Sequence, residues 1–172
     1  MACGSNPFFL ELPLNKANTS GNTPVTALAS PFVAEINPPT PLGYRMDAVA
    51  TLPNDRVNSQ WLNNESARGV LHFRLMIAIP GGATVTGNIR IQLQIASANQ
   101  FRPFTPVFSN SNVSATIPIT VLSIMQVIAV PISISDEFLQ PGQLVICSWQ
   151  RISPVGTDLS VPIYALAASV SR

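Results

Sequence analysis

A strict alternation of polar and apolar residues runs through positions 88 to 95, where the chain reads Asn-Ile-Arg-Ile-Gln-Leu-Gln-Ile. Successive side chains of a β-strand point to opposite faces of the sheet. The apolar residues of this stretch would therefore line one buried face, and the polar residues between them would face water. The predicted buried set is Ile89, Ile91, Leu93 and Ile95.

The same period of two recurs along much of the chain, whereas no segment shows the apolar spacing of an amphipathic helix. Clusters of Pro, Gly, Asn and Asp, which favour turns, separate most of the candidate strands. The predicted strands are Val25–Ile36, Tyr44–Leu52, Gln60–Asn63, Gly69–Ile79, Val85–Ala96, Thr105–Phe108, Ala115–Ile124, Gln126–Ile134, Leu144–Ile152 and Leu159–Val170.

Consecutive strands with no helices between them indicate a closed barrel or a two-sheet sandwich. We expect an all-β fold, an antiparallel jelly-roll sandwich that spans residues 25–172. Residues 1–24 show little regular pattern and carry several Pro, Gly and Asn residues, so they predict an extended N-terminal arm. Within this arm we expect one short strand at Phe8–Leu12.

Charge is scarce in this chain. Charged residues make up 10% of it, apolar residues 47%, and the formal net charge is +1. A nearly neutral chain has little repulsion to keep its copies apart, which favours self-association; a neutral soluble monomer is the alternative interpretation. The chain has no basic run that could neutralise phosphates on any scale, so we expect no nucleic-acid partner.

The last two predicted strands, Leu144–Ile152 and Leu159–Val170, are largely apolar on both faces. A strand of a monomeric antiparallel sandwich normally exposes one polar face. Their pattern therefore predicts an outer face covered by a second subunit or by the arm, although an unusually thick single-chain core would give the same pattern. The candidate assembly surface comprises Phe8, Phe9, Leu10, Trp149 and Tyr164.

No residue pattern indicates catalysis. The only histidine, His72, falls on the polar face of a strand beside Arg74, with no orienting partner in the sequence. The adjacent carboxylates Asp136 and Glu137 would point apart in an extended chain. There is no nucleophile elbow, phosphate loop or cysteine–histidine cluster. We predict no enzyme, no catalytic residue, no metal site, no cofactor and no small-molecule ligand.

The two cysteines lie far apart in the sequence, Cys3 in the arm and Cys147 in a predicted strand. One interpretation is a free thiol at Cys3 and a small buried side chain at Cys147. The other is a disulfide between copies, in which Cys3 of one arm reaches Cys147 of another subunit. Sequence alone does not give the connectivity.

The first residues lack the positive segment and the long apolar segment of a secretion signal, so we expect none. The longest run without charge, residues 103–135, contains three prolines and many Ser, Thr and Asn, which disfavour a transmembrane helix. We therefore expect no membrane partner.

The stretch from Asp136 to Val145 places Pro141-Gly142 directly before a hydrophobic strand, and a loop and a final strand follow. This arrangement resembles the closing half of the trimeric tumour-necrosis-factor/C1q-like jelly-rolls and of the related surface proteins of bacterial endospores, over roughly residues 115–172. The latter include exosporium basal-layer proteins and subunits of endospore appendage fibres. The resemblance implies a structural subunit that assembles with itself at a spore surface.

The cysteines add to this resemblance. The N-terminal connectors of appendage-fibre subunits carry cysteines that bond to strand cysteines of other subunits, which is similar to the placement of Cys3 and Cys147. Those connectors usually hold several cysteines, whereas this one holds one.

We expect an extracellular fibre or surface layer that is assembled inside a cell and released by lysis. Virions are released in the same way, so a viral capsid, decoration or fibre-head protein is the alternative. A lectin module would require exposed aromatic residues on one sheet face, and the tryptophans and tyrosines here are few and scattered: Tyr44, Trp61, Trp149 and Tyr164.

Overall fold

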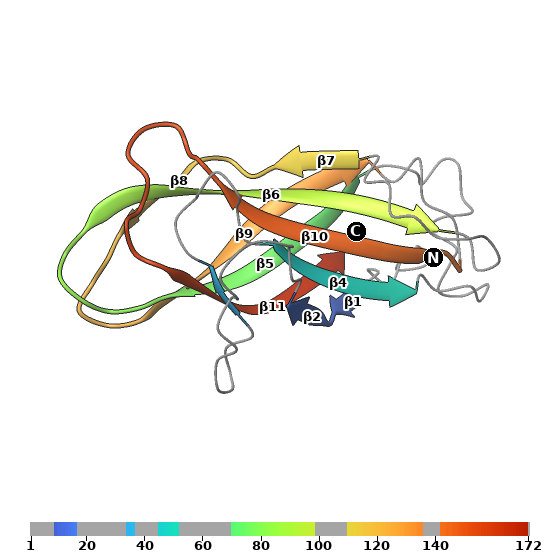
Figure 1. Ribbon diagram of the computed structural model, residues 1–172, viewed down its shortest axis with the longest axis horizontal. Coiled ribbons are helices and arrows are strands. Elements are labelled where there is room, and N and C mark those ends of the chain that lie inside the picture. Colours follow the sequence, from blue (N-terminus) through green and yellow to red (C-terminus); the bar gives the residue numbers. More distant parts are fainter. Residues whose placement is uncertain are drawn as a thin grey trace, which may run out of the picture.

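The computed structural model describes residues 9–16, 34–36, 45–51, 70–98, 110–135 and 142–171, and all regular structure within them is β-strand. The strands form two sheets, and every ladder between named strands is antiparallel (Figure 1). The predicted all-β jelly-roll sandwich is confirmed. The described ranges contain no helix with the length and apolar character needed to cross a membrane.

The first sheet has five strands. Along its main path the order is β1 (Phe9–Leu12), β11 (Ile163–Ser171), β5 (Val70–Ile79) and β9 (Gln126–Ser135). The short strand β3 (Ala34–Ile36) pairs with the first residues of β11, while β1 pairs with its last residues. Among the strands that the structure describes, β9 therefore forms one edge of this sheet.

The second sheet has six strands. Its main order is β2 (Leu14–Lys16), β4 (Arg45–Thr51), β10 (Leu144–Ile152), β6 (Thr86–Ala98) and β7 (Asn110–Val113). The sixth strand, β8 (Ile117–Thr120), pairs with the beginning of β6, while β7 pairs further along the same strand.

The N-terminal segment joins the two sheets. β1 pairs with β11 in the first sheet and β2 pairs with β4 in the second, with only Pro13 between β1 and β2. The predicted short strand at Phe8–Leu12 is confirmed as β1, whereas β2 was not predicted. Residues 9–16 of the predicted arm thus belong to the sandwich; the rest of the arm and the predicted boundary at 24/25 lie outside the described residues.

The core lies between the sheets and follows the predicted alternation. Ile89, Ile91, Leu93 and Ile95 of β6 are all fully buried. The inward-facing residues of β5, from Leu71 to Ile77, meet them across the sandwich and belong to the same cluster. Each such side chain contributes roughly 1.5–3 kcal/mol when it is removed from water. The polar residues between them on β6 are only partly buried, as a surface face requires.

Several predicted strand bounds are corrected. Residues 110–112 begin β7, although Asn and Ser favour turns. Pairing with residues 92–95 of β6 overrides that preference. The predicted strand Ala115–Ile124 is only Ile117–Thr120, since the following five residues connect the two sheets. Gln60–Asn63, Thr105–Phe108 and most of Val25–Ile36 lie outside the described residues.

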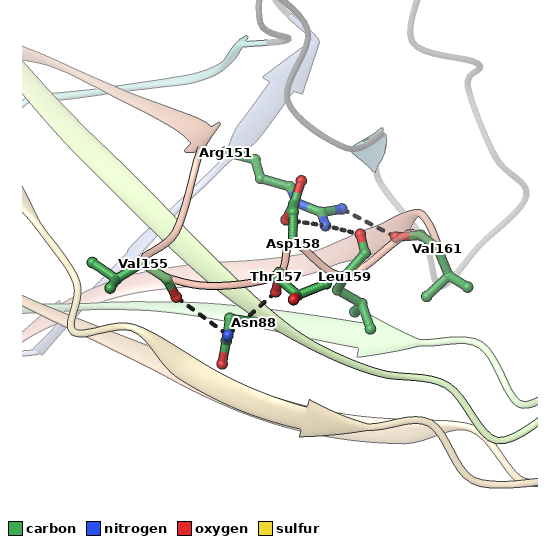
Figure 2. A network of polar contacts seen from close by, with 7 residues as sticks. All are labelled: Asn88, Arg151, Val155, Thr157, Asp158, Leu159 and Val161. Atoms are coloured by element: carbon green, nitrogen blue, oxygen red, sulfur yellow. Dashed lines mark hydrogen bonds and ion pairs between the residues drawn. The ribbon is translucent and has the colours of Figure 1, made fainter.

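The β10–β11 loop is folded around a buried arginine (Figure 2). Arg151 is 2% exposed and donates through its guanidinium to the carbonyl oxygens of Val161 (3.1 Å) and Leu159 and to Asp158 Oδ1 (3.0 Å). Desolvation lowers the pKa of Arg151 below its usual value, and the carboxylate of Asp158 opposes that shift. A charged side chain thus orders the loop by pairing with groups that the loop supplies.

β6 holds the same loop from its other side. The side-chain amide of Asn88 donates to the carbonyl oxygens of Val155 and Thr157, each at 3.2 Å, and its backbone bonds to Thr157 and Leu159 (Figure 2). Gly87 permits this contact, because a Cβ atom there would lie 2.6 Å from Leu159 Cα. The loop is therefore pinned to the sheet through backbone groups.

We expect Gly87→Ala to displace the loop and to lower the free energy of unfolding by roughly 1–3 kcal/mol, because the added methyl meets backbone atoms that cannot rotate away. Hydrogen exchange should accelerate at the amides of Asn88 and Leu159, which both bond across this contact. The control is Gly82→Ala, since a Cβ at Gly82 has no atom within 4 Å. Equal stability of the two variants would contradict the close approach.

Candidate assembly surface

The residues predicted to form the assembly surface do not lie together. Trp149 is 1% exposed and belongs to the core, so its prediction as a surface residue is wrong. Leu10 packs against the core from β1, and Tyr164 lies partly buried near the beginning of β11. Phe8 and the side chain of Phe9 lie outside the described residues.

The reason for the correction is the phase of β10. Val145, Cys147, Trp149 and Arg151 alternate on one face of the strand, and that face is the inner one. Cys147 is 1% exposed, as the interpretation of a small buried side chain expects. A thiol from another copy reaches it only if the sandwich opens. Cys3 lies outside the described residues, so the structure does not test the predicted disulfide.

Exposed apolar side chains gather instead at the connection between β8 and β9. Leu122, Ile124 and Met125 lie in this connection and Val127 is the second residue of β9; their exposed fractions are 44%, 69%, 48% and 54%. We name these four residues the apolar tip. Large apolar residues exposed in one continuous segment are typical of contact surfaces rather than of random surface positions.

The apolar tip rests on an ordered support. The backbone N–H of Gly82 donates to the carbonyl of Leu122 at 2.9 Å, and the N–H of Val121 donates to the carbonyl of Val85 at 2.8 Å. Gly81 fits closely beneath, since a Cβ there would lie 2.5 Å from the carbonyl oxygen of Ser123. Residues 80–85, which connect β5 of the first sheet to β6 of the second, therefore hold the tip by backbone contacts, and its apolar side chains project from a fixed base.

A groove lies where the N-terminal segment crosses between the sheets. Its volume is about 570 Å³, and its lining includes Pro13, Leu14, Met76 and Leu166. Leu166 is the extra residue of a β-bulge, because the register between β11 and β5 shifts between Ala165 and Ala167. Among the described residues that line it, Glu11 is the only ionisable group. One carboxylate beside apolar side chains provides no acid–base pair within this part of the lining.

The one histidine takes part in a surface contact. His72 Nδ1 lies 3.0 Å from Ser133 Oγ, and both side chains are on the outer face of the first sheet. The described residues contain no group of three or more His, Cys, Asp or Glu side chains that could hold a metal ion. Asp136 and Glu137 lie outside those residues.

Comparisons with known proteins concern the fold. No protein-family model matches the chain, and no curated protein matches it. Among solved structures, it is similar to a xylan-binding module, CBM15, with a TM-score of 0.42 and 11% identity, over 96% of this chain and 97% of that chain. It is also similar to the CBM22-1–GH10 modules of endo-1,4-beta-D-xylanase 10B from Clostridium thermocellum, solved with xylohexaose. There the TM-score is 0.37 and the identity 13%, over 98% of this chain and 27% of that chain. Neither similarity carries a ligand or an activity over to this chain.

Proposed function

We propose that this chain is a structural subunit that assembles with copies of itself into an extracellular fibre or surface layer, of the kind found on bacterial spores. The observation that carries the proposal is the apolar tip. Ile124 and Val127 are more than half exposed, and backbone hydrogen bonds hold the connection that presents them. Burying such side chains against another molecule is favourable, because each loses its contact with water.

The scarcity of charge supports a partner of the same kind. No charged residue occurs between Pro103 and Ser135, a range that includes the whole tip. Copies of one chain that meet through this region bring no like charges together, and they desolvate no unpaired charge.

The described aromatic residues favour assembly over sugar binding. Lectin modules stack sugars on exposed aromatic side chains. Trp149 is buried and Tyr164 is partly buried, and all the large apolar residues exposed in the described ranges are aliphatic. A flat aromatic platform is therefore absent from this part of the structure.

We expect Ile124→Asp to weaken assembly about tenfold or more, because it replaces an apolar contact with a charge that must be desolvated. Sedimentation velocity over a concentration series measures the effect. The matched control is Val155→Asp, which adds the same charge at an exposed aliphatic residue outside the range Pro103–Ser135. Stability should change by no more than about 0.5 kcal/mol in either variant, since both sites are exposed.

Electron microscopy of the concentrated wild-type protein tests the kind of assembly. Fibres or sheets are expected, and closed shells would favour the viral structural protein instead. A single-chain particle at every concentration would overturn the proposed function.

A further inference from the structure

The first sheet ends in a strand whose outer edge has two unlike halves. β9 pairs with β5 along its whole length, from Gln126 opposite Ile79 to Ser135 opposite Val70. No other named strand pairs with β9 in the described parts of the chain. The backbone groups on its far side therefore form a sheet edge, the kind of surface that invites pairing with another chain.

The identity of the groups on this edge follows from Pro131. Proline has no N–H, so a proline that keeps its place in a ladder directs its nitrogen away from the partner strand. Because backbone direction alternates along a strand, the edge then carries the N–H and C=O groups of every second residue: Val127, Ala129, Pro131, Ser133 and Ser135. The contact of Asn112 agrees, since its side-chain amide donates to the carbonyl of Ser133 at 2.5 Å from β7, outside the first sheet.

The second half of the edge is blocked. Pro131 offers no donor, and the carbonyl of Ser133 is already bonded to Asn112. Natural proteins protect sheet edges with prolines, charges and covering segments. Here the protection begins at Pro131 and does not extend to Val127 and Ala129, whose side chains are exposed.

We propose that the open half of this edge, Val127 to Ala129, pairs antiparallel with the same segment of a second copy, so that the two first sheets join into one. This inference deepens the proposed function and rests on it. With Val127 of one copy opposite Ala129 of the other, each residue pair exchanges two backbone hydrogen bonds, and Pro131 stops the ladder beyond them.

The occupant is a second copy because the segment is self-complementary. A two-fold contact brings each residue close to its own equivalent, so any charged residue would meet a like charge. The run without charge from Pro103 to Ser135 removes that repulsion. The apolar tip adjoins the open half through Val127, so pairing also brings exposed apolar side chains of both copies together. The pair is then the unit from which a second contact extends a fibre or layer.

The test is Ala129→Pro. It removes the edge-facing N–H of Ala129 and leaves the ladder with β5 intact, as the native Pro131 already does two residues later. We expect the concentration for half-maximal association to rise at least about tenfold. Each copy loses the N–H of residue 129, so two of the four backbone hydrogen bonds between the copies are lost, while the apolar character of the side chain changes little. The control is Ser135→Pro, which removes an N–H on the same edge beyond the blocked part, and association should stay at the wild-type level.

A measurement without substitution keeps the test independent of folding. The Val127 and Ala129 amides should exchange rapidly in dilute protein and at least about tenfold more slowly in concentrated protein, whereas the Ser135 amide should not change. If the wild type associates while Ala129→Pro associates equally and the two amides stay unprotected, the edge proposal is wrong and the proposed function stands. If the wild type never associates, both are wrong.

Discussion

Replacing Arg151 with methionine is expected to lower the free energy of unfolding by about 3–5 kcal/mol, because groups that pair with a buried charge lose their partner. The guanidinium satisfies the carbonyls of Leu159 and Val161 and the carboxylate of Asp158. Methionine fills a similar volume and donates nothing. Urea unfolding measures the difference. The control is Arg74→Met, since Arg74 is exposed on β5 and should change stability by no more than about 0.5 kcal/mol.

A companion variant separates charge from packing. Asp158→Asn keeps the size of the side chain and its acceptor oxygen but removes the charge that opposes the desolvation of Arg151. We expect a smaller loss than for Arg151→Met, because the two carbonyl partners remain and Asp158 is partly exposed to water. Wild-type stability in both variants would mean that the loop folds without the buried pair.

The sequence was sufficient to predict strands whose pattern reports burial directly. In β6, alternation alone identified the four buried residues, because that strand is polar on one face and apolar on the other. In β10 the bounds Leu144–Ile152 were also predicted. Which face of β10 points inward was not predicted, because apolar residues occupy both faces. Arg151 lies on the inward face, and the sequence does not show that the following loop supplies partners for its charge.

The apolar tip was harder to predict, because its exposure depends on where the residues lie in the fold rather than on their residue type. Leu122, Ile124 and Met125 resemble core residues in the sequence, and the first two fall inside the predicted strand Ala115–Ile124. Their exposure follows from the connection between β8 and β9, which crosses from one sheet to the other. One local signal was available: the adjacent apolar pairs Val121-Leu122 and Ile124-Met125 break the alternation that runs from Ile117 to Val121.

Burial of Trp149 leads to the last prediction. Its side chain packs in the core, and the indole N–H has no hydrogen-bond partner among the described residues. Trp149→Ala should cost about 3–5 kcal/mol, because it removes a large buried side chain and leaves a cavity. Trp149→Phe should cost less, since most of the apolar volume remains and an unpaired buried donor disappears.

The same pair of variants distinguishes a core residue from a contact residue. Urea unfolding gives the stability of each variant, and sedimentation under conditions where all are folded gives their association. We expect Trp149→Ala to fall in stability and to associate as the wild type does, whereas Ile124→Asp shows the reverse. Unchanged stability with lost association in Trp149→Ala would return Trp149 to the assembly surface, and wild-type association of Ile124→Asp would exclude the apolar tip from it.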